Sequence, residues 1–176
     1  DYEGLDLLLQ AVAIIRRDVG DSMRVLLVGD GPIFDDLREM SRFLGINDIV
    51  TFTGRVPHDE VQRYYSVVDI FAFPRKSKRV CELVSPLKPF EAMSMKKAVI
   101  ASNVQALSEI IDDGVTGLLH QKDDVDSLAD CIKKLVLDDN LRDNLASEGH
   151  KWVKKHRAWR VVAKIVAEKY DELQSS

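Results

Sequence analysis

Short apolar runs alternate along this chain with amphipathic segments, and this alternation limits its fold more than any other feature. Runs without polar alternation are typical of parallel strands that helices cover on both faces. Strands are predicted at residues 23–29, 48–54, 69–74, 98–102 and 116–120. Helices are predicted at residues 3–18, 33–44, 59–68, 89–97 and 106–114. The pattern predicts an α/β fold with a Rossmann-like, doubly wound parallel sheet.

The two ends of the chain depart from simple alternation. From Val125 to Leu173 the periodicity is helical throughout, which predicts three C-terminal helices. The chain opens directly on a helix, whereas a doubly wound half normally begins with a strand. We therefore expect a fragment of a larger two-domain enzyme that lacks its first strand, with a gap in the sheet beside residues 24–29. The length of 176 residues predicts a single domain, residues 1–176.

Composition excludes several classes of function. A formal net charge of -4 with scattered basic residues gives no electrostatic reason to bind nucleic acid. The two cysteines, Cys81 and Cys131, show no metal-ligand spacing and are expected to be reduced and buried. The four histidines are dispersed and are interpreted as surface residues. No apolar stretch reaches the length of a membrane span and no signal peptide is apparent, so a soluble cytoplasmic protein is expected.

Gly29 ends the first predicted strand and Gly31 lies two positions later. Pro32 suits the first turn of the next helix. Ligands of open parallel sheets bind outside the carboxyl ends of the strands, so these glycines could present backbone N–H groups to an anion. A plain tight turn is the alternative interpretation. The segment lacks the third glycine of a dinucleotide-binding fingerprint, which counts against a dehydrogenase.

Two further strand ends carry candidate ligand contacts. After residues 48–54, the loop with Arg55 and Val56 could present its backbone to the edge of a heterocyclic base, while Arg55 could face a phosphate or merely solvent. After residues 69–74, four cations lie within residues 75–79 and could balance a diphosphate. A solvated surface loop explains the same cations.

The segment CELVSPLKPFEAM, residues 81–93, combines groups that suit a sugar nucleotide. Ser85 and Pro86 lie where a helix could begin, and the first-turn N–H groups of a helix bind phosphate. Glu91 follows within the first turns, where its carboxylate could accept hydrogen bonds from the vicinal hydroxyls of a ribose. In the alternative interpretation, Ser85 caps the helix, Glu91 pairs with Lys88 in solvent, and Phe90 packs in the core.

Seven segments together resemble the C-terminal, donor-binding domain of the retaining GT-B glycosyltransferases, in the group called family four or group one. In chain order they are EGLDLLLQA, VGDGP, VTFTGRVP, YYSVVDIFAFP, SPLKPFEAMSMKKAVIAS, LSEIIDDGVTGLLH and DDVDSLADCIKKLVLDD. The resemblance covers nearly the whole chain, and the combination of PLKPFEAM with DGVTGLL is its most specific part.

The resemblance implies roles for individual residues. The helix-opening turn would bind the donor diphosphate through the backbone amides of Leu87 and Lys88, since the neighbouring Pro86 has no N–H. Glu91 would hold the ribose hydroxyls. Arg55 and Val56 would contact the base.

Two positions depart from the family pattern. A sugar-contacting glutamate normally lies eight positions before the ribose-binding one, where this chain has Leu83. The role is assigned to Glu82, one position earlier; the alternative is that the sugar is held differently. Many relatives also carry a lysine or arginine just before GLDLLL, whereas this chain has Glu3. The task of neutralising the phosphates is expected to pass to one of the cations Arg75, Lys76, Lys78 and Arg79, and Arg79 lies closest to the turn.

The resemblance implies transfer of a sugar from a nucleoside-diphosphate sugar to an acceptor, with retention of anomeric configuration. No metal and no cofactor are expected, and the acceptor would be bound by an N-terminal domain absent from this chain, so the isolated fragment should be inactive. A non-catalytic nucleotide-binding module and a nucleotide-sugar epimerase of the same architecture are the alternatives. The basic segment 151–160, with Trp152 and Trp159, is expected to pack as a helix end; contact with the inner face of a membrane is its alternative interpretation.

Overall fold

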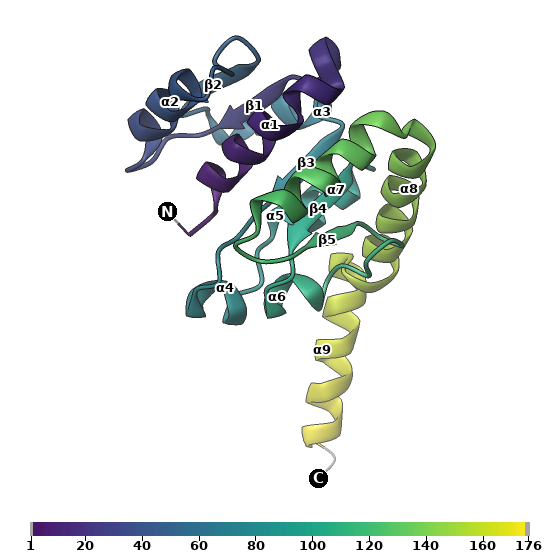
Figure 1. The fold of residues 1–176 in the computed structure, drawn as a ribbon. Coiled ribbons are helices and arrows are strands. Elements are labelled where there is room, and N and C mark those ends of the chain that lie inside the picture. Colours follow the sequence, from purple (N-terminus) through teal and green to yellow (C-terminus); the bar gives the residue numbers. More distant parts are fainter. Residues whose placement is uncertain (1, 175–176) are drawn as a thin grey trace.

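Five short strands and a series of helices alternate in the computed structural model, which describes residues 2–174 (Figure 1). The strands are β1 (Val25–Val28), β2 (Val50–Gly54), β3 (Ile70–Phe73), β4 (Ala98–Ser102) and β5 (Leu118–His120). The α-helices are α1 (Leu5–Val19), α2 (Phe34–Phe43), α3 (Val61–Ser66), α4 (Arg79–Leu83), α5 (Lys88–Ser94), α6 (Gln105–Ser108), α7 (Val125–Leu137), α8 (Asp139–His156) and α9 (Trp159–Gln174). This alternation confirms the predicted α/β class.

All the strand pairs are parallel, and they form two separate sheets. One contains β1 and β2, the other has the order β3-β4-β5. Within residues 2–174, β1 and β3 therefore share no ladder. The expected gap in the sheet beside β1 is present, and the identity of a strand that would fill it stays a prediction.

Strand β4 separates two hydrophobic cores, because its side chains alternate between the two faces of its sheet. Ala98 and Ile100 belong to the core that α1 and α7 cover. Val99 and Ala101 belong to the core that includes Met93 of α5 and residues of α6 and α8. Every residue of β4 is buried. Helices on both faces of a parallel sheet are what a doubly wound fold requires.

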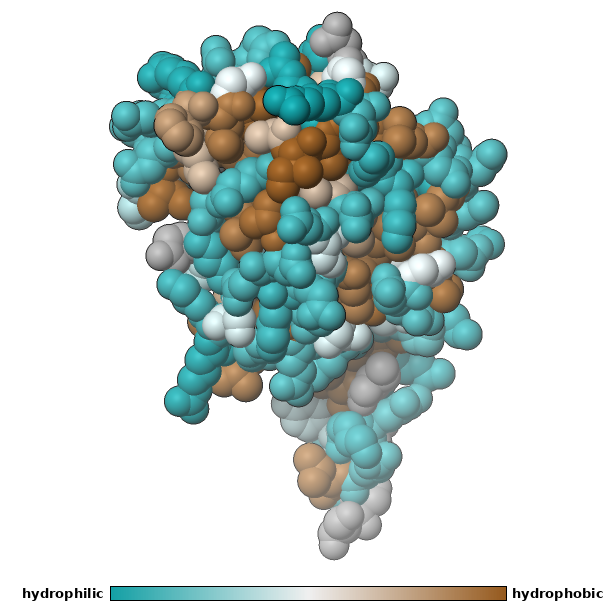
Figure 2. Space-filling view, viewed as in Figure 1, coloured by the Kyte–Doolittle hydropathy of each residue, from teal (hydrophilic) through white to brown (hydrophobic). Residues whose placement is uncertain are grey.

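Three helices complete the chain, as predicted. Helix α7 packs against α1, and α8 packs against α5 and β4. Helix α9 extends away from the body of the molecule (Figure 1). Figure 2 shows a mainly hydrophilic surface, with hydrophobic side chains gathered in the upper half, where α1 and α2 lie.

Two helical assignments from the sequence are wrong in detail. Residues 75–78 of the cationic segment form a loop, as interpreted, but Arg79 begins α4, a five-residue helix that the sequence did not predict and whose Cys81 is fully buried. The helix predicted at residues 106–114 ends after four residues, at Ser108. Helices this short have almost no intrinsic stability and depend on tertiary packing, which leaves little periodic signal in the sequence.

Candidate functional site

The carboxyl ends of β1 and β2 bring two predicted contact segments together. The Gly29 N–H donates to the Gly54 carbonyl oxygen at 3.0 Å. Both glycines have positive φ, 121° and 66°, a backbone conformation that favours glycine. Gly31 and Arg55 lie next to this junction and are exposed, and Val56 is half-buried. The structure thus places the predicted anion turn and the predicted base loop side by side.

The first turn of α5 offers free backbone donors where the sequence predicted them. Among the described residues, the N–H groups of Leu87 and Lys88 donate to no backbone carbonyl. Helix α5 begins at Lys88 with Leu87 as its N-cap residue, so Ser85 does not cap it. Ser85 lies in the exposed loop between α4 and α5. That loop is open to an approaching ligand.

Glu91 projects from α5 with an exposed side chain. Burial, followed by the nearby negative charge of Glu91, raises the pKa of Tyr65. The alternative ion pair between Glu91 and Lys88 is not found among the described residues. Phe90 does pack against the second core, where its ring stacks on Trp152 with centroids 6.4 Å apart.

Glu82 joins α4 to the ends of β4 and β5. One carboxylate oxygen accepts a hydrogen bond from the Gln105 N–H at 2.7 Å, and the other lies 2.6 Å from Lys122 Nζ. The Gln105 N–H, then Lys122, lower the pKa of Glu82. Gln105 is the first residue of α6, so Glu82 supplies the acceptor that this helix start needs. Both oxygens of the predicted sugar-contacting carboxylate have partners within the protein.

Lys122 and Gln105 did not emerge from the sequence as site residues. They lie 40 and 23 positions after Glu82, and no local spacing connects the three. A second hydrogen bond links the loops that follow β4 and β5, because the Lys122 N–H donates to Asn103 Oδ1 at 2.8 Å. The signal in the sequence is their position, since Gln105 lies three residues and Lys122 two residues after the end of a predicted strand.

The predicted phosphate-neutralising cations fall into different settings. The Arg75 side chain is only 10% exposed and forms an ion pair with Glu3, at 3.1 Å. Lys76 pairs with Asp6, at 2.6 Å. Arg79 is exposed at the first residue of α4. Arg79 is therefore more accessible to a soluble anion than Arg75 and Lys76, and its contact with phosphate stays a prediction.

The turn before α1 packs tightly against the end of β3. Gly4 has a φ of 73°, and a Cβ atom there would lie 1.8 Å from the Pro74 carbonyl oxygen. Glycine is thus required at this position for both backbone conformation and space. This contact brings Glu3 to the segment that follows β3.

His120 is buried at the end of β5, with 1% of its surface exposed, so its interpretation as a surface residue is wrong. Its Nδ1 lies 2.7 Å from the Gln121 carbonyl oxygen and must carry the proton that this contact needs. Among the described residues, its Nε2 and the hydroxyl of its ladder partner Ser102 have no hydrogen-bond partner. Burial lowers the pKa of His120, against the hydrogen bond that its Nδ1 donates to the Gln121 carbonyl oxygen and against the charges of Asp124 and Asp123.

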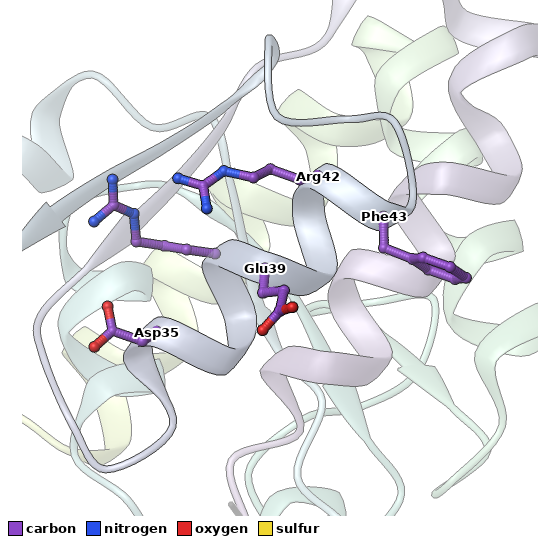
Figure 3. A pocket seen from close by; sticks show the side chains of 5 residues that line it. Asp35, Glu39, Arg42 and Phe43 are labelled. Atoms are coloured by element: carbon purple, nitrogen blue, oxygen red, sulfur yellow. The ribbon is translucent and has the colours of Figure 1, made fainter.

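A separate hollow in the described surface lies away from these residues. It has a volume of about 690 Å³ along α2 and is lined by Asp35, Arg38, Glu39, Arg42 and Phe43. Figure 3 shows the side chains of Arg42 and Phe43 diverging from α2. None of these residues is a predicted donor contact, so this hollow is not the candidate site.

Within residues 2–174, no group of three or more His, Cys, Asp or Glu side chains is arranged to hold a metal ion. The same residues include no helix with the length and apolar character needed to cross a bilayer.

Comparison with known proteins identifies the family to which the chain belongs. The sequence model for the family "Glycosyl transferases group 1" matches residues 1–152. The chain belongs to the group 1 glycosyl transferases. Its fold is that of the Rossmann-like C-terminal domain of GT-B enzymes, as the resemblance implied. The C-terminal domain of a group 1 glycosyl transferase from Francisella tularensis matches 90% of the chain, and the chain covers 81% of it, with a TM-score of 0.78 and 23% identity.

Relatives in this family are considerably longer than the chain. It is 32% identical over 168 residues to a GDP-mannose-dependent alpha-(1-6)-phosphatidylinositol monomannoside mannosyltransferase of Mycobacterium tuberculosis, covering 94% of this chain and 43% of that relative. It is 34% identical over 175 residues to a D-inositol 3-phosphate glycosyltransferase of Nocardia farcinica, covering 94% and 37%. The structure of Anabaena Alr3699/HepE in complex with UDP-glucose matches with a TM-score of 0.83 and 20% identity, covering 97% of this chain and 46% of that one. The chain thus spans less than half the length of these relatives.

Proposed function

We propose that this chain binds the nucleoside-diphosphate sugar donor of a glycosyltransferase that retains anomeric configuration. The observation that carries the proposal is the pairing of an exposed Glu91 with free N–H groups at Leu87 and Lys88 in one short helix start. A carboxylate can accept bonds from two ribose hydroxyls while neighbouring amides bind phosphate. Family membership supports the same assignment.

The remaining contacts follow from where the strand ends lie. Gly29 and Gly31 would offer backbone donors to the donor molecule, and Arg55 and Val56 would line the base. Arg79 and the loop hydroxyl of Ser85 would lie beside the diphosphate. During transfer, negative charge grows on the departing diphosphate, and preorganised amides and a cation stabilise it. The proposal assigns this work to protein groups and to no metal or cofactor.

Nucleotide titration tests the proposal. Calorimetry with UDP and with GDP should detect binding of at least one, and the relatives motivate both probes: one is named for GDP-mannose and one structure holds UDP-glucose. Glu91→Gln should weaken that binding at least about tenfold, because charge-assisted hydrogen bonds are roughly twice as strong as neutral ones. Glu39→Gln, an equally exposed glutamate on α2, is the control and should change nothing. Equal affinities for both variants would refute the role of Glu91.

The engagement of Glu82 by Gln105 and Lys122 is the observation that favours a second function, a nucleotide-binding module without catalysis. A transfer assay on the protein with an acceptor-binding domain would decide between the two. Binding without turnover supports the module, whereas turnover supports the transferase and leaves contact between Glu82 and the sugar as a prediction. A cytoplasmic location and contact with the membrane also stay predictions.

A further inference from the structure

Arg75 is a buried cation that connects two distant parts of the chain. It directly follows the loop start at Pro74, and its side chain is 10% exposed. Its Nε and Nη2 donate to the two carboxylate oxygens of Glu3, at 3.4 and 3.1 Å. Its Nη1 donates to the Val84 carbonyl oxygen at 3.0 Å. One planar guanidinium therefore holds a side chain before α1 and a backbone group after α4 in fixed relation.

Val84 is the point at which α4 ends and the loop to α5 begins. It is the C-cap residue of α4, in an extended conformation with φ −107° and ψ 109°. Its carbonyl cannot continue the helix pattern, so it needs another donor. Arg75 supplies that donor, which fixes the direction in which the chain leaves α4 towards Ser85 and Leu87.

A direct contact between Arg75 and phosphate is the competing interpretation. Glu3 already neutralises the guanidinium, and the guanidinium is enclosed by protein, with the Tyr2 ring centroid 6.0 Å from its central carbon. Arg79 remains exposed nearer the start of the loop. Buried, paired and hydrogen-bonded to backbone, Arg75 has the surroundings of a residue that acts through another.

We propose that Arg75, oriented by Glu3, is a positioning residue for nucleoside-diphosphate binding: it holds the Val84 carbonyl and thereby places the loop that carries the diphosphate-binding amides. This inference rests on the proposed function. It also accounts for the acidic residue before Gly4, since Glu3 serves as the partner of Arg75 rather than as a phosphate contact. The two interpretations of Arg75 predict opposite effects when Glu3 loses its charge.

The test is calorimetric titration of the chain and its variants with UDP and GDP, and with UMP and GMP. Glu3→Gln removes a negative charge and loosens Arg75. A positioning role predicts that the diphosphate affinity falls by about threefold or more, whereas a phosphate-contacting Arg75 predicts that it rises. Arg75→Lys keeps the positive charge but loses the planar guanidinium that reaches Glu3 and Val84 at once. A positioning role therefore predicts that the diphosphate affinity falls by about tenfold. The ratio of diphosphate to monophosphate affinity should fall in both variants, which a general loss of stability would not produce.

Lys133→Gln is the matched control, because Lys133 also forms an ion pair with a carboxylate of the N-terminal region, Asp18 of α1, and leaves Val84 untouched. In this control variant, the ratio of diphosphate to monophosphate affinity should stay within about twofold of that of the wild type. An unchanged or tighter diphosphate affinity in Glu3→Gln overturns the inference, even where Arg75→Lys fails to fold. If the wild-type chain binds neither UDP nor GDP, the proposed function fails and the inference fails with it; wild-type binding with unaffected variants overturns the inference alone.

Discussion

The two parallel sheets differ in how their strand ends are held together. In the β1–β2 sheet, the ends meet through backbone, where the Gly29 N–H donates to the Gly54 carbonyl oxygen. In the β3–β4–β5 sheet, side chains cross between loops, as Glu82 does to Gln105 and Lys122. Glycine turns adapt easily, whereas charge-assisted side-chain bonds fix geometry. We therefore expect the part of the proposed site that would hold the base to adapt to its ligand. We expect the part that would hold the sugar and the diphosphate to be preorganised.

The same contrast appears in the burial of the strands. Every residue of β4 is buried, whereas β1 mixes buried, half-buried and exposed residues. Ile100 is fully buried between helices, and Leu26 of β1 is half-buried. Three predictions sharpen or break this comparison.

The largest effect is expected from truncating one side chain in β4 and comparing it with the same change in β1. Ile100→Ala should lower the free energy of unfolding by about 3–5 kcal/mol, since it leaves a cavity between packed helices. Leu26→Ala removes the same number of carbon atoms and should cost less than about 2 kcal/mol, because water already reaches that side chain. Urea unfolding measures both. Similar losses in the two variants would contradict the asymmetry.

A smaller effect should appear in acid, because the second sheet buries His120. Its folded-state pKa lies below the ordinary value of 6.5, so the unfolded chain binds more protons as the pH falls past that value. The free energy of unfolding should therefore fall by up to about 1.4 kcal/mol per pH unit below pH 6.5, until His120 is protonated in the folded state as well.

Urea titrations at a series of pH values measure this slope. His120→Gln should remove its share of the slope, while His58→Gln, an exposed histidine on the β2 side, should leave it unchanged. A wild-type slope that persists in His120→Gln would show that other groups cause it.

The smallest effect is expected from the loop bridges themselves. Glu82→Ala removes the acceptor for the Gln105 N–H and the partner of Lys122, and should lower the melting temperature by about 2–4 °C. Glu82→Gln keeps an acceptor oxygen and should recover part of that loss. Arg55→Ala, the counterpart at the end of β2, should leave the melting temperature nearly unchanged because Arg55 is exposed. An equal drop for Arg55→Ala would contradict the contrast between the two sheets.

Much of the fold could be predicted because burial on both faces leaves a plain sequence signal. The run AVIAS became β4 within the predicted bounds, and the amphipathic periodicity before Val19 became α1. The gap beside β1 was also anticipated, from the order of helices and strands. By contrast, α4 could not be predicted, because its five residues are helical through the burial of Cys81 in the second core rather than through their own periodicity.

The candidate site was predictable in position but not in its internal bonds. Parallel topology gathers Gly29, Arg55 and the segment around Glu91 at strand ends, which the sequence pattern alone indicates. The partners of Glu82 come from two loops far along the chain, and spacing carries no information on such contacts. Likewise, whether His120 faces water or the core depends on the register of β5. A slip of one residue in that register would move every side chain of the strand to the opposite face.

The bond from Glu82 to Gln105 has a consequence for the order of folding. Helix α6 has four residues, too few to nucleate alone, and its first N–H is satisfied by a side chain 23 positions earlier. Helix α6 also contacts α4, whose Cys81 is buried in the same core as Leu107 of α6. We therefore expect the loop edge that carries Glu82 and Gln105 to become ordered only together with the sheet that supports it.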